Sequence, residues 1–174
     1  MNPNHQLDKI WYNNYTSPLG ELKIASSPTG VCRLSLPSES WEDFITALRK
    51  QYPESRLDRG LGENSKVIQE LKEYFSGRRQ QFTCDLDLQG TEFQLQVWEA
   101  LRKIPFGTTC SYEDIARAVG REKGSRAVGQ ANGLNPVSII IPCHRVVTKD
   151  GKLGGYGGGP ELKRYLLTLE SMTK

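Results

Sequence analysis

The sequence predicts an α+β fold, in which a small N-terminal antiparallel sheet with helices precedes a mostly helical C-terminal domain that contains a helix-turn-helix. Two observations support this prediction. Strand-like runs separated by turn signals open the chain, whereas helical periodicity with capping residues dominates its second half. Residues 82–90 look like a linker between the two parts. We therefore expect two domains, residues 1–88 and residues 89–174.

Three strands and two helices are expected in the first domain. Residues 10–16, 19–26 and 30–36 are strand-like and are separated by S-P-L-G and S-P-T-G, which favours an antiparallel meander. Apolar residues then recur at helical spacing over residues 40–52 and 64–77. The helical signature consists of the N-cap Ser40 with Trp41, Phe44, Ile45 and Leu48 in the first helix, and of Val67, Ile68, Leu71 and Phe75 in the second.

Three further helices are expected near the start of the second domain. The motif T-x-x-Q at residues 91–94 fits a capping box and opens a helix that stops before Pro105. Its apolar face consists of Phe93, Val97, Leu101 and Ile104. Ser111 would cap a short helix ending at Gly120, and residues 126–133 would form the next. Two short helices joined by a tight, glycine-containing turn are typical of a helix-turn-helix.

The helix expected over residues 126–133 is built largely from small residues. These are Ala127, Gly129, Ala131 and Gly133. Small side chains allow a helix backbone to approach a partner closely. The partner is either a shallow nucleic-acid groove, with Arg126 as the one long side chain at the helix start, or a neighbouring helix in the core. Spacing alone leaves both alternatives open.

Composition and charge restrict the class of protein. Apolar residues make up 37% of the 174 residues and charged residues 25%, as in globular soluble proteins. No apolar run approaches the roughly 20 residues of a membrane span, and the first nine residues lack a secretory signal. We therefore expect a cytoplasmic protein without membrane attachment. Residues 90–174 carry a net charge of +4 and residues 1–89 one of −1, which permits a polyanionic partner but equally fits a solvated basic surface.

No metal or other cofactor is expected. The four cysteines are scattered without a C-x-x-C pair, and the two histidines, His5 and His144, lie far apart. Structural zinc sites normally use close Cys and His pairs, so this spacing argues against one. A reducing cytoplasm likewise argues against a disulfide framework.

The segment I-I-I-P-C-H-R-V-V, residues 139–147, places Cys143 beside His144 between two apolar runs. Cys143 is either a buried structural residue or a nucleophile. A nucleophilic thiol needs a base or a positive field, because an unperturbed cysteine with a pKa of about 8.5 is mostly protonated at neutral pH. His144 could be that base, directly if the chain turns locally or otherwise through a bridging water. The carboxylate that orients His144 could be Glu113, Asp114, Asp150, Glu161 or Glu170.

Residues 151–160, G-K-L-G-G-Y-G-G-G-P, contain six glycines. This composition rules out a strand or helix interior and indicates a mobile lid or a place where backbone meets a ligand. A phosphate-binding loop does not fit, since no G-K-[ST] follows. A closing helix is expected over residues 161–170, with Leu162, Tyr165, Leu166 and Leu169 at packing intervals.

Four motifs together resemble the O6-alkylguanine-DNA alkyltransferases, which repair DNA by direct reversal. They are P-F-G-T-T-x-S-Y at 105–112, S-R-A-V-G-Q-A-N-G-L-N-P at 125–136, P-C-H-R-V-V at 142–147 and G-G-Y-G-G-G at 154–159. The resemblance covers about residues 90–174 and extends to the helix ending in Glu170. The N-terminal part is similar only in its general α+β build.

The resemblance implies that Cys143 accepts an alkyl group irreversibly from a flipped guanine, so that each molecule acts once. His144 would deprotonate Cys143 through a water and be oriented by Glu170. Asn135 would brace the turn that joins the helix-turn-helix to the active-site segment. Tyr112 would press on the backbone of the target nucleotide and aid departure of the guanine.

The resemblance also implies a partner, double-stranded DNA carrying alkylated guanine, with the helix 126–133 in the minor groove. The residues expected to contact DNA are Tyr112, Ser125, Arg126, Ala127 and Gly129, and Arg126 would fill the space left by the flipped base. The base would be bound by the backbone at Val146, Tyr156 and Gly157; position 157 is often serine in relatives. O4-alkylthymine is a further expected substrate. A monomer is expected, which could assemble cooperatively on DNA.

Three other functions fit the sequence less well. A non-catalytic lesion-binding relative would lack the acceptor thiol, and this chain has Cys143. A cysteine hydrolase using Cys143 and His144 would leave the helix-turn-helix unexplained. A transcriptional regulator would need more base-reading side chains than residues 126–133 offer.

Overall fold

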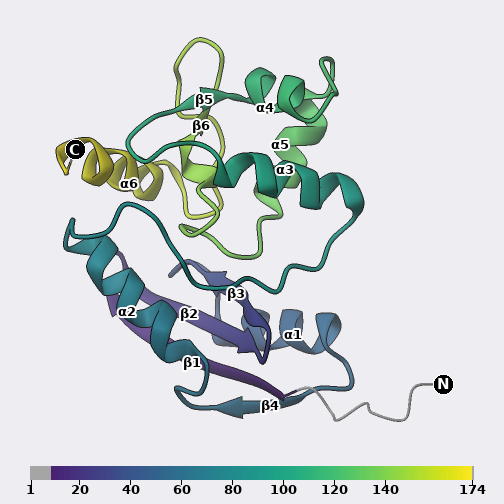
Figure 1. Cartoon of the computed structure of the whole chain (residues 1–174), viewed down its shortest axis with the longest axis vertical. Helices are drawn as coiled ribbons and strands as arrows, with labels where there is room; N and C mark the ends of the chain where they lie inside the picture. Colours follow the sequence, from purple (N-terminus) through teal and green to yellow (C-terminus); the bar gives the residue numbers. More distant parts are fainter. Residues whose placement is uncertain (1–8, 174) are drawn as a thin grey trace.

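The computed structural model describes residues 9–173, with a four-stranded sheet at one end and most of the later helices at the other (Figure 1). The antiparallel meander is confirmed: β1 (Lys9–Ser17) pairs with β2 (Gly20–Ser27), which pairs with β3 (Gly30–Ser35). A fourth strand, β4 (Arg56–Arg59), pairs parallel with β1 and makes the sheet mixed. The sequence pattern does not predict β4, because R-L-D-R has three charged residues and no apolar alternation.

Two helices cover opposite faces of this sheet. Helix α1 (Trp41–Gln51) lies behind it and helix α2 (Asn64–Phe75) in front (Figure 1). The predicted N-cap is confirmed, since the Ser40 side chain accepts a hydrogen bond from the Asp43 backbone N–H at 3.0 Å. Strand β2 is therefore covered on both sides, and its residues from Leu22 onward are all buried.

The second half begins with three helices, α3 (Glu92–Arg102), α4 (Tyr112–Ala118) and α5 (Ser125–Gly133). The capping box predicted at Thr91 and the cap predicted at Ser111 are confirmed, and Ser111 also forms a capping box with Asp114. Helices α4 and α5 pack against each other and against α3, which gives the predicted helix-turn-helix.

Two predicted apolar faces are rotated slightly. On α2 the buried aromatic residue is Tyr74, while Phe75 is half-buried. On α3 Trp98 is buried and its indole N–H donates to the Ala131 carbonyl at 2.9 Å, while Phe93 is half-buried. Adjacent aromatic or apolar residues on a helix are about 100° apart, so periodicity alone does not decide which of them faces the core.

The segment expected to be a linker, residues 82–90, lies along the outer edge of β3. The Val31 N–H donates to the Asp85 carbonyl at 2.9 Å, and the Asp87 N–H donates to the Val31 carbonyl at 2.9 Å. This backbone pairing covers the edge of β3 and fixes the path from the sheet to α3.

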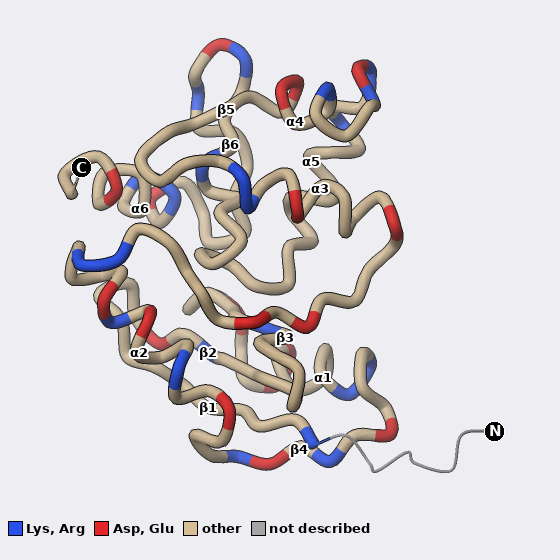
Figure 2. The backbone as a smooth tube through the Cα atoms, in the orientation of Figure 1, with Lys and Arg blue, Asp and Glu red and all other residues tan. Residues whose placement is uncertain are grey.

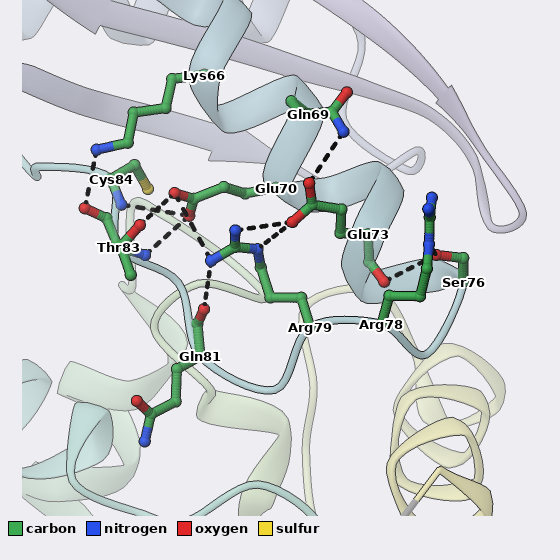
Figure 3. A network of polar contacts seen from close by, with 10 residues as sticks. All are labelled: Lys66, Gln69, Glu70, Glu73, Ser76, Arg78, Arg79, Gln81, Thr83 and Cys84. Carbon is green, nitrogen blue, oxygen red and sulfur yellow. Dashed lines mark hydrogen bonds and ion pairs between the residues drawn. The ribbon is translucent and has the colours of Figure 1, made fainter.

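A polar network attaches the start of that segment to α2 (Figure 3). The Glu70 carboxylate accepts hydrogen bonds from the Thr83 N–H at 2.8 Å, the Thr83 hydroxyl at 2.6 Å and the Cys84 N–H at 3.2 Å. Arg79 forms an ion pair of 2.7 Å with Glu73. The segment between Arg79 and Cys84 is therefore held against the helix that covers the sheet.

A second stretch of the C-terminal half also pairs with β3. The Leu34 N–H donates to the Pro136 carbonyl at 2.9 Å, and the Ser138 N–H donates to the Leu34 carbonyl at 3.1 Å. One continuous hydrophobic cluster then joins the two halves and includes Leu22, Ile24, Tyr74, Trp98, Val137 and Cys143. A domain boundary at residue 88 stays a prediction.

The chain closes with β5 (Cys110–Ser111) paired parallel to β6 (Val146–Val147), a 3-10 helix η1 (Cys143–Arg145), and the last helix α6 (Pro160–Met172). Within the described part of the chain, no helix is both long and apolar enough to cross a membrane. Most of the N-terminal stretch that bears on a secretory signal, residues 1–8, lies outside the described residues.

Candidate active site

Cys143 follows a tight turn formed by residues 137–141. The Ile141 N–H donates to the Val137 carbonyl at 3.0 Å, and Ile139 has a φ of 72°, which is costly for a β-branched residue. Asn135 braces this turn from both sides, since its amide donates to the Ile141 carbonyl at 2.8 Å and its side-chain oxygen accepts from the Val137 N–H at 3.0 Å. The buried isoleucines therefore anchor a strained turn, which indicates a positional constraint.

Cys143 lies at the wall of a cavity of about 430 Å³ and is 4% exposed. Most of the cavity is formed by α5, the turn and the glycine loop. The other lining residues are Leu36, Tyr112, Gly129, Asn132, Gly133, Asn135, Ser138, Gly155, Tyr156 and Gly157. Tyr112, Asn135, Cys143, Tyr156 and Gly157 are thus brought together as predicted site residues. Leu36 is the only contributor from the described part of the first 88 residues.

The Cys143 thiol is protonated at rest. Burial raises its pKa, and this effect outweighs a hydrogen bond from the Asn135 amide to Sγ at 3.2 Å and the positive charge of Lys163. A thiol with a raised pKa needs a base before it can act as a nucleophile.

His144 is available as that base. Its Nε2 lies 2.7 Å from Glu170 Oε1, and its Nδ1 is buried without a hydrogen-bond partner among the described residues. Burial lowers the pKa of His144, although the Glu170 carboxylate opposes this, so the ring is neutral near pH 7. With Nε2–H directed at Glu170, the lone pair of Nδ1 is free to accept a proton.

The Glu170 carboxylate accepts several buried hydrogen bonds. Arg145 donates to it through Nε at 2.9 Å and through its terminal nitrogen at 3.0 Å. The Tyr74 hydroxyl donates at 2.7 Å and the Gly107 N–H at 3.1 Å. Burial alone would raise the pKa of Glu170, but the hydrogen bonds from His144 and Arg145 bring it down to about 2. Glu170 is therefore a fixed anion.

Among the five carboxylates left open by the sequence, Glu170 is the one that contacts His144 in the described chain. The other four are engaged elsewhere: Glu113 with Lys149, Asp114 in the cap of α4 and with Arg117, Asp150 with Lys152, and Glu161 with Arg164.

Helix α6 carries a buried lysine that sequence reasoning missed. Lys163 donates to the carbonyls of Val146 at 2.7 Å, Gly155 at 3.3 Å and Leu153. The buried face of α6 consists of Lys163, Leu166 and Glu170, whereas Tyr165, predicted for that face, is exposed. Lys163 and Glu170 are seven positions apart, which is about two helical turns. This spacing places both side chains on one face of the helix and could have identified them as inward-facing polar groups.

The glycine loop is held close to the cavity. Gly154 has a φ of 68°, and a Cβ there would lie 3.3 Å from the Tyr112 hydroxyl oxygen. At Gly158 a Cβ would lie 2.9 Å from the Leu36 side chain. Lys163 holds two carbonyls of this loop, and the loop backbone approaches Tyr112 and Leu36 closely. Both features favour a loop whose backbone contacts a ligand over a mobile lid.

Val146 differs from the other predicted pocket residues. It is fully buried and is not part of the cavity lining, and its carbonyl accepts a hydrogen bond from Lys163.

Helix α5 presents one face to the core and another to solvent. Val128, Ala131 and Asn132 are buried, Arg126 and Ala127 are exposed, and Ser125 and Gly129 are half-buried. The core alternative is thus confirmed for one face of this small-residue helix, while the opposite face is exposed and groove binding by it stays a prediction. Figure 2 shows basic residues at the α4–α5 end of the molecule and along the loop beside it, interspersed with acidic ones.

Another cavity, of about 470 Å³, lies between the end of α3 and the segment around Phe82. Its cysteine, Cys84, has a pKa raised to about 12, chiefly by burial and also by the charge of Glu70. The pKa of Cys143 is raised as well, but Cys143 directly precedes His144, which is paired with Glu170, so Cys143 is the better candidate for a nucleophile. No group of three potential His, Cys, Asp or Glu metal ligands is found within residues 9–173.

Comparisons with known proteins cover nearly the whole chain. A family model described as "6-O-methylguanine DNA methyltransferase, DNA binding domain" matches residues 92–172, and one described as its "ribonuclease-like domain" matches residues 10–88. The constitutive methylated-DNA–protein-cysteine methyltransferase of Bacillus subtilis is 43% identical over 94% of this chain and 96% of its own length. The methylated-DNA–protein-cysteine methyltransferase of Mycobacterium bovis is 42% identical over 92% of each.

Solved structures give the same result. The O6-methylguanine methyltransferase of Mycobacterium tuberculosis superposes with a TM-score of 0.81 at 41% identity, covering 95% of this chain and 94% of that one. A complex of that organism's OGT with DNA gives a TM-score of 0.83 at 39% identity, covering 94% of each chain. Both halves of the sequence and the fold therefore agree, and the chain belongs to the 6-O-methylguanine DNA methyltransferase family.

Proposed function

We propose that this protein repairs DNA by direct reversal, acting as a methylated-DNA–protein-cysteine methyltransferase that takes an alkyl group from O6 of guanine onto Cys143. The observation that carries this proposal is the geometry of Cys143, a protonated thiol in a cavity wall next to a His144–Glu170 pair. One S–C bond forms as one C–O6 bond breaks, and the thiol proton is replaced by the alkyl group. The thioether is stable, so each molecule acts once.

His144 and Glu170 supply the proton transfer. His144 would take the Cys143 proton at Nδ1 through a water, and the Glu170 anion would stabilise the resulting imidazolium. The released guanine takes up one proton, so thiol and alkylated base become thioether and guanine. Tyr112, on the cavity wall, would press on the nucleotide backbone and aid departure of the guanine.

The target base must leave the duplex to reach the cavity. Flipping costs a few kcal/mol, and less for a poorly paired lesion. The solvent-facing side of α5 would enter the minor groove, with Ser125, Ala127 and Gly129 allowing close approach and Arg126 occupying the vacated space. The backbone of Tyr156 and Gly157, with the backbone around Val146, would bind the flipped guanine, and O4-alkylthymine could enter the same cavity.

A stoichiometric titration tests this function. The protein is mixed with an excess of duplex DNA carrying O6-methylguanine, and restored guanine is counted. We expect one guanine restored per protein molecule and no further reaction over time. Multiple turnovers, or no restored guanine, would contradict the proposed function.

Arg126→Ala is expected to slow transfer from duplex DNA by about tenfold and to leave transfer from a free O6-alkylguanine base unchanged, because only duplex DNA has a vacated space to fill. Arg117→Ala provides a matched control, since Arg117 is also exposed on the helix-turn-helix and pairs with Asp114 at 3.3 Å. Single-turnover rates on both substrates measure the difference. Equal loss on both substrates would rule out the space-filling role.

Leu36→Ala is expected to raise the rate with O6-benzylguanine relative to O6-methylguanine by about tenfold, because pocket contacts of this size discriminate by 1–3 kcal/mol. Leu36 lines the cavity and packs against the loop at Gly158. Leu57→Ala, in the sheet but remote from the cavity, is the control. The ratio of the two single-turnover rates is the measurement, and an unchanged ratio would show that Leu36 does not limit substrate size.

A further inference from the structure

We infer that Tyr74, on the helix that covers the N-terminal sheet, is a positioning residue for the transfer reaction: its hydroxyl holds the Glu170 carboxylate and keeps His144 a neutral base. This inference rests on the proposed function and gives the N-terminal half a part in the chemistry. His144 lies in η1 and Glu170 on α6, both in the C-terminal half, whereas Tyr74 on α2 is 96 residues before Glu170 in the chain.

The hydroxyl of Tyr74 binds the same carboxylate oxygen that faces His144. Tyr74 Oη donates to Glu170 Oε1 at 2.7 Å, and His144 Nε2 lies 2.7 Å from that oxygen. All three side chains are buried, with exposures of 1% or less. The terminal nitrogen of Arg145 donates to the same oxygen at 3.0 Å. Hydrogen bonds to a buried carboxylate are strong, and these three donors share the negative charge of Oε1.

The ring of Tyr74 is fixed by aromatic neighbours. Its centroid lies 5.3 Å from Phe75, 5.3 Å from Phe82 and 6.2 Å from Phe106. The position of Phe82 depends in turn on the hydrogen bonds of Glu70 to the adjacent Thr83, drawn in Figure 3. The hydroxyl is therefore aimed at Glu170 by packing that does not involve Glu170.

Other charged and polar groups surround the same pair. They are Arg145 on η1, Lys163 on α6, the Gly107 N–H, the Cys143 thiol and the Tyr156 hydroxyl. None of these groups changes when the Tyr74 hydroxyl alone is removed. The negative charge of Oε1 would then be shared by fewer donors and would stabilise a His144 imidazolium more strongly. The pKa of His144 would rise, and more of it would already be protonated at neutral pH.

Tyr74→Phe tests this role because it keeps the ring packing and removes only the hydroxyl. We expect the acid limb of the single-turnover rate profile to move to higher pH by about one unit, the scale on which one hydrogen bond to a charged group shifts a pKa. The rate on that limb falls by up to about tenfold, while the high-pH plateau stays within about twofold of the unsubstituted protein. Phe75→Leu loosens the same aromatic cluster and is expected to leave the limb in place.

A titration of His144 by NMR provides a readout without substrate. The sequence has two histidines, so a His5→Gln variant assigns the His144 imidazole signals. We expect a higher His144 pKa in Tyr74→Phe and an unchanged one in Phe75→Leu. An unchanged His144 pKa, or a uniform loss of rate at all pH values, would overturn the role of Tyr74. The proposed function is tested separately, by guanine restoration in the unsubstituted protein.

Discussion

Replacing Cys143 with alanine is expected to abolish alkyl transfer, with a loss of at least about 10³-fold, the scale found when an enzyme loses its nucleophile. Cys143 is the thiol that lines the cavity together with Tyr112 and Tyr156. The fold should persist, because alanine removes only a sulfur atom and leaves Asn135 its hydrogen bonds to Ile141 and Val137. Restored guanine per protein molecule is the measurement.

Cys110→Ser provides the matched control. Cys110 lies in β5, which pairs with β6 immediately after η1, and is half-buried. Burial and the Asp114 charge raise the pKa of Cys110 to about 11, and Cys110 does not line the cavity, so it is expected to take no part. Normal transfer by Cys110→Ser with none by Cys143→Ala is the predicted pair of results. Transfer that survives the loss of Cys143 would exclude it as the acceptor.

Glu170→Gln is expected to damage both rate and stability. An amide cannot stabilise a His144 imidazolium as a carboxylate does, so we expect a rate loss of about 10²-fold. Arg145 is 6% exposed and would be left as an unpaired buried charge, which costs about 3–5 kcal/mol. Single-turnover rates and thermal unfolding measure the two effects. Glu161→Gln, an exposed change on the same helix, is expected to alter neither.

The unfolding free energy of the protein is expected to fall at low pH because of the same carboxylate. Because the pKa of Glu170 is lowered from 4.5 to about 2, its ionisation contributes stability that is fully present above pH 4.5. That contribution, about 3 kcal/mol, is lost as the pH falls through about 2. In Glu170→Gln the fall in unfolding free energy between these pH values is expected to be smaller. An identical pH dependence in both proteins would show that Glu170 is not held as an anion.

The helices with capping signals could be predicted from the sequence. Ser40, Thr91 and Ser111 carry capping signals that act within one helical turn, and the structure confirms each of them. Strand β4 was not accessible, because a short edge strand with charged residues is fixed by pairing with β1 and not by its own pattern.

The residues of the site also differ in whether a local sequence signal identifies them. Cys143 and His144 are adjacent, and the pairing of a thiol with an imidazole singles them out, whereas Asn135 was indicated only by the resemblance to the alkyltransferases. Leu36, just after β3, and Tyr74 on α2 reach the site only through the packing of distant elements, and spacing along the chain carries no record of such contacts. For the same reason, spacing alone could not decide which of five carboxylates contacts His144. The packing of α6 places Glu170 there. Lys163 differs, because its helical spacing from Glu170 is a local signal.

Peptide mass spectrometry after reaction with a duplex containing O6-methylguanine tests the identity of the acceptor most directly. The described chain has four cysteines, of which Cys32, Cys84 and Cys110 have pKa values raised to about 12, 12 and 11. We predict one added methyl group per molecule, confined to the peptide that contains Cys143. A methyl group on any other residue, or more than one per molecule, would contradict Cys143 as the single acceptor.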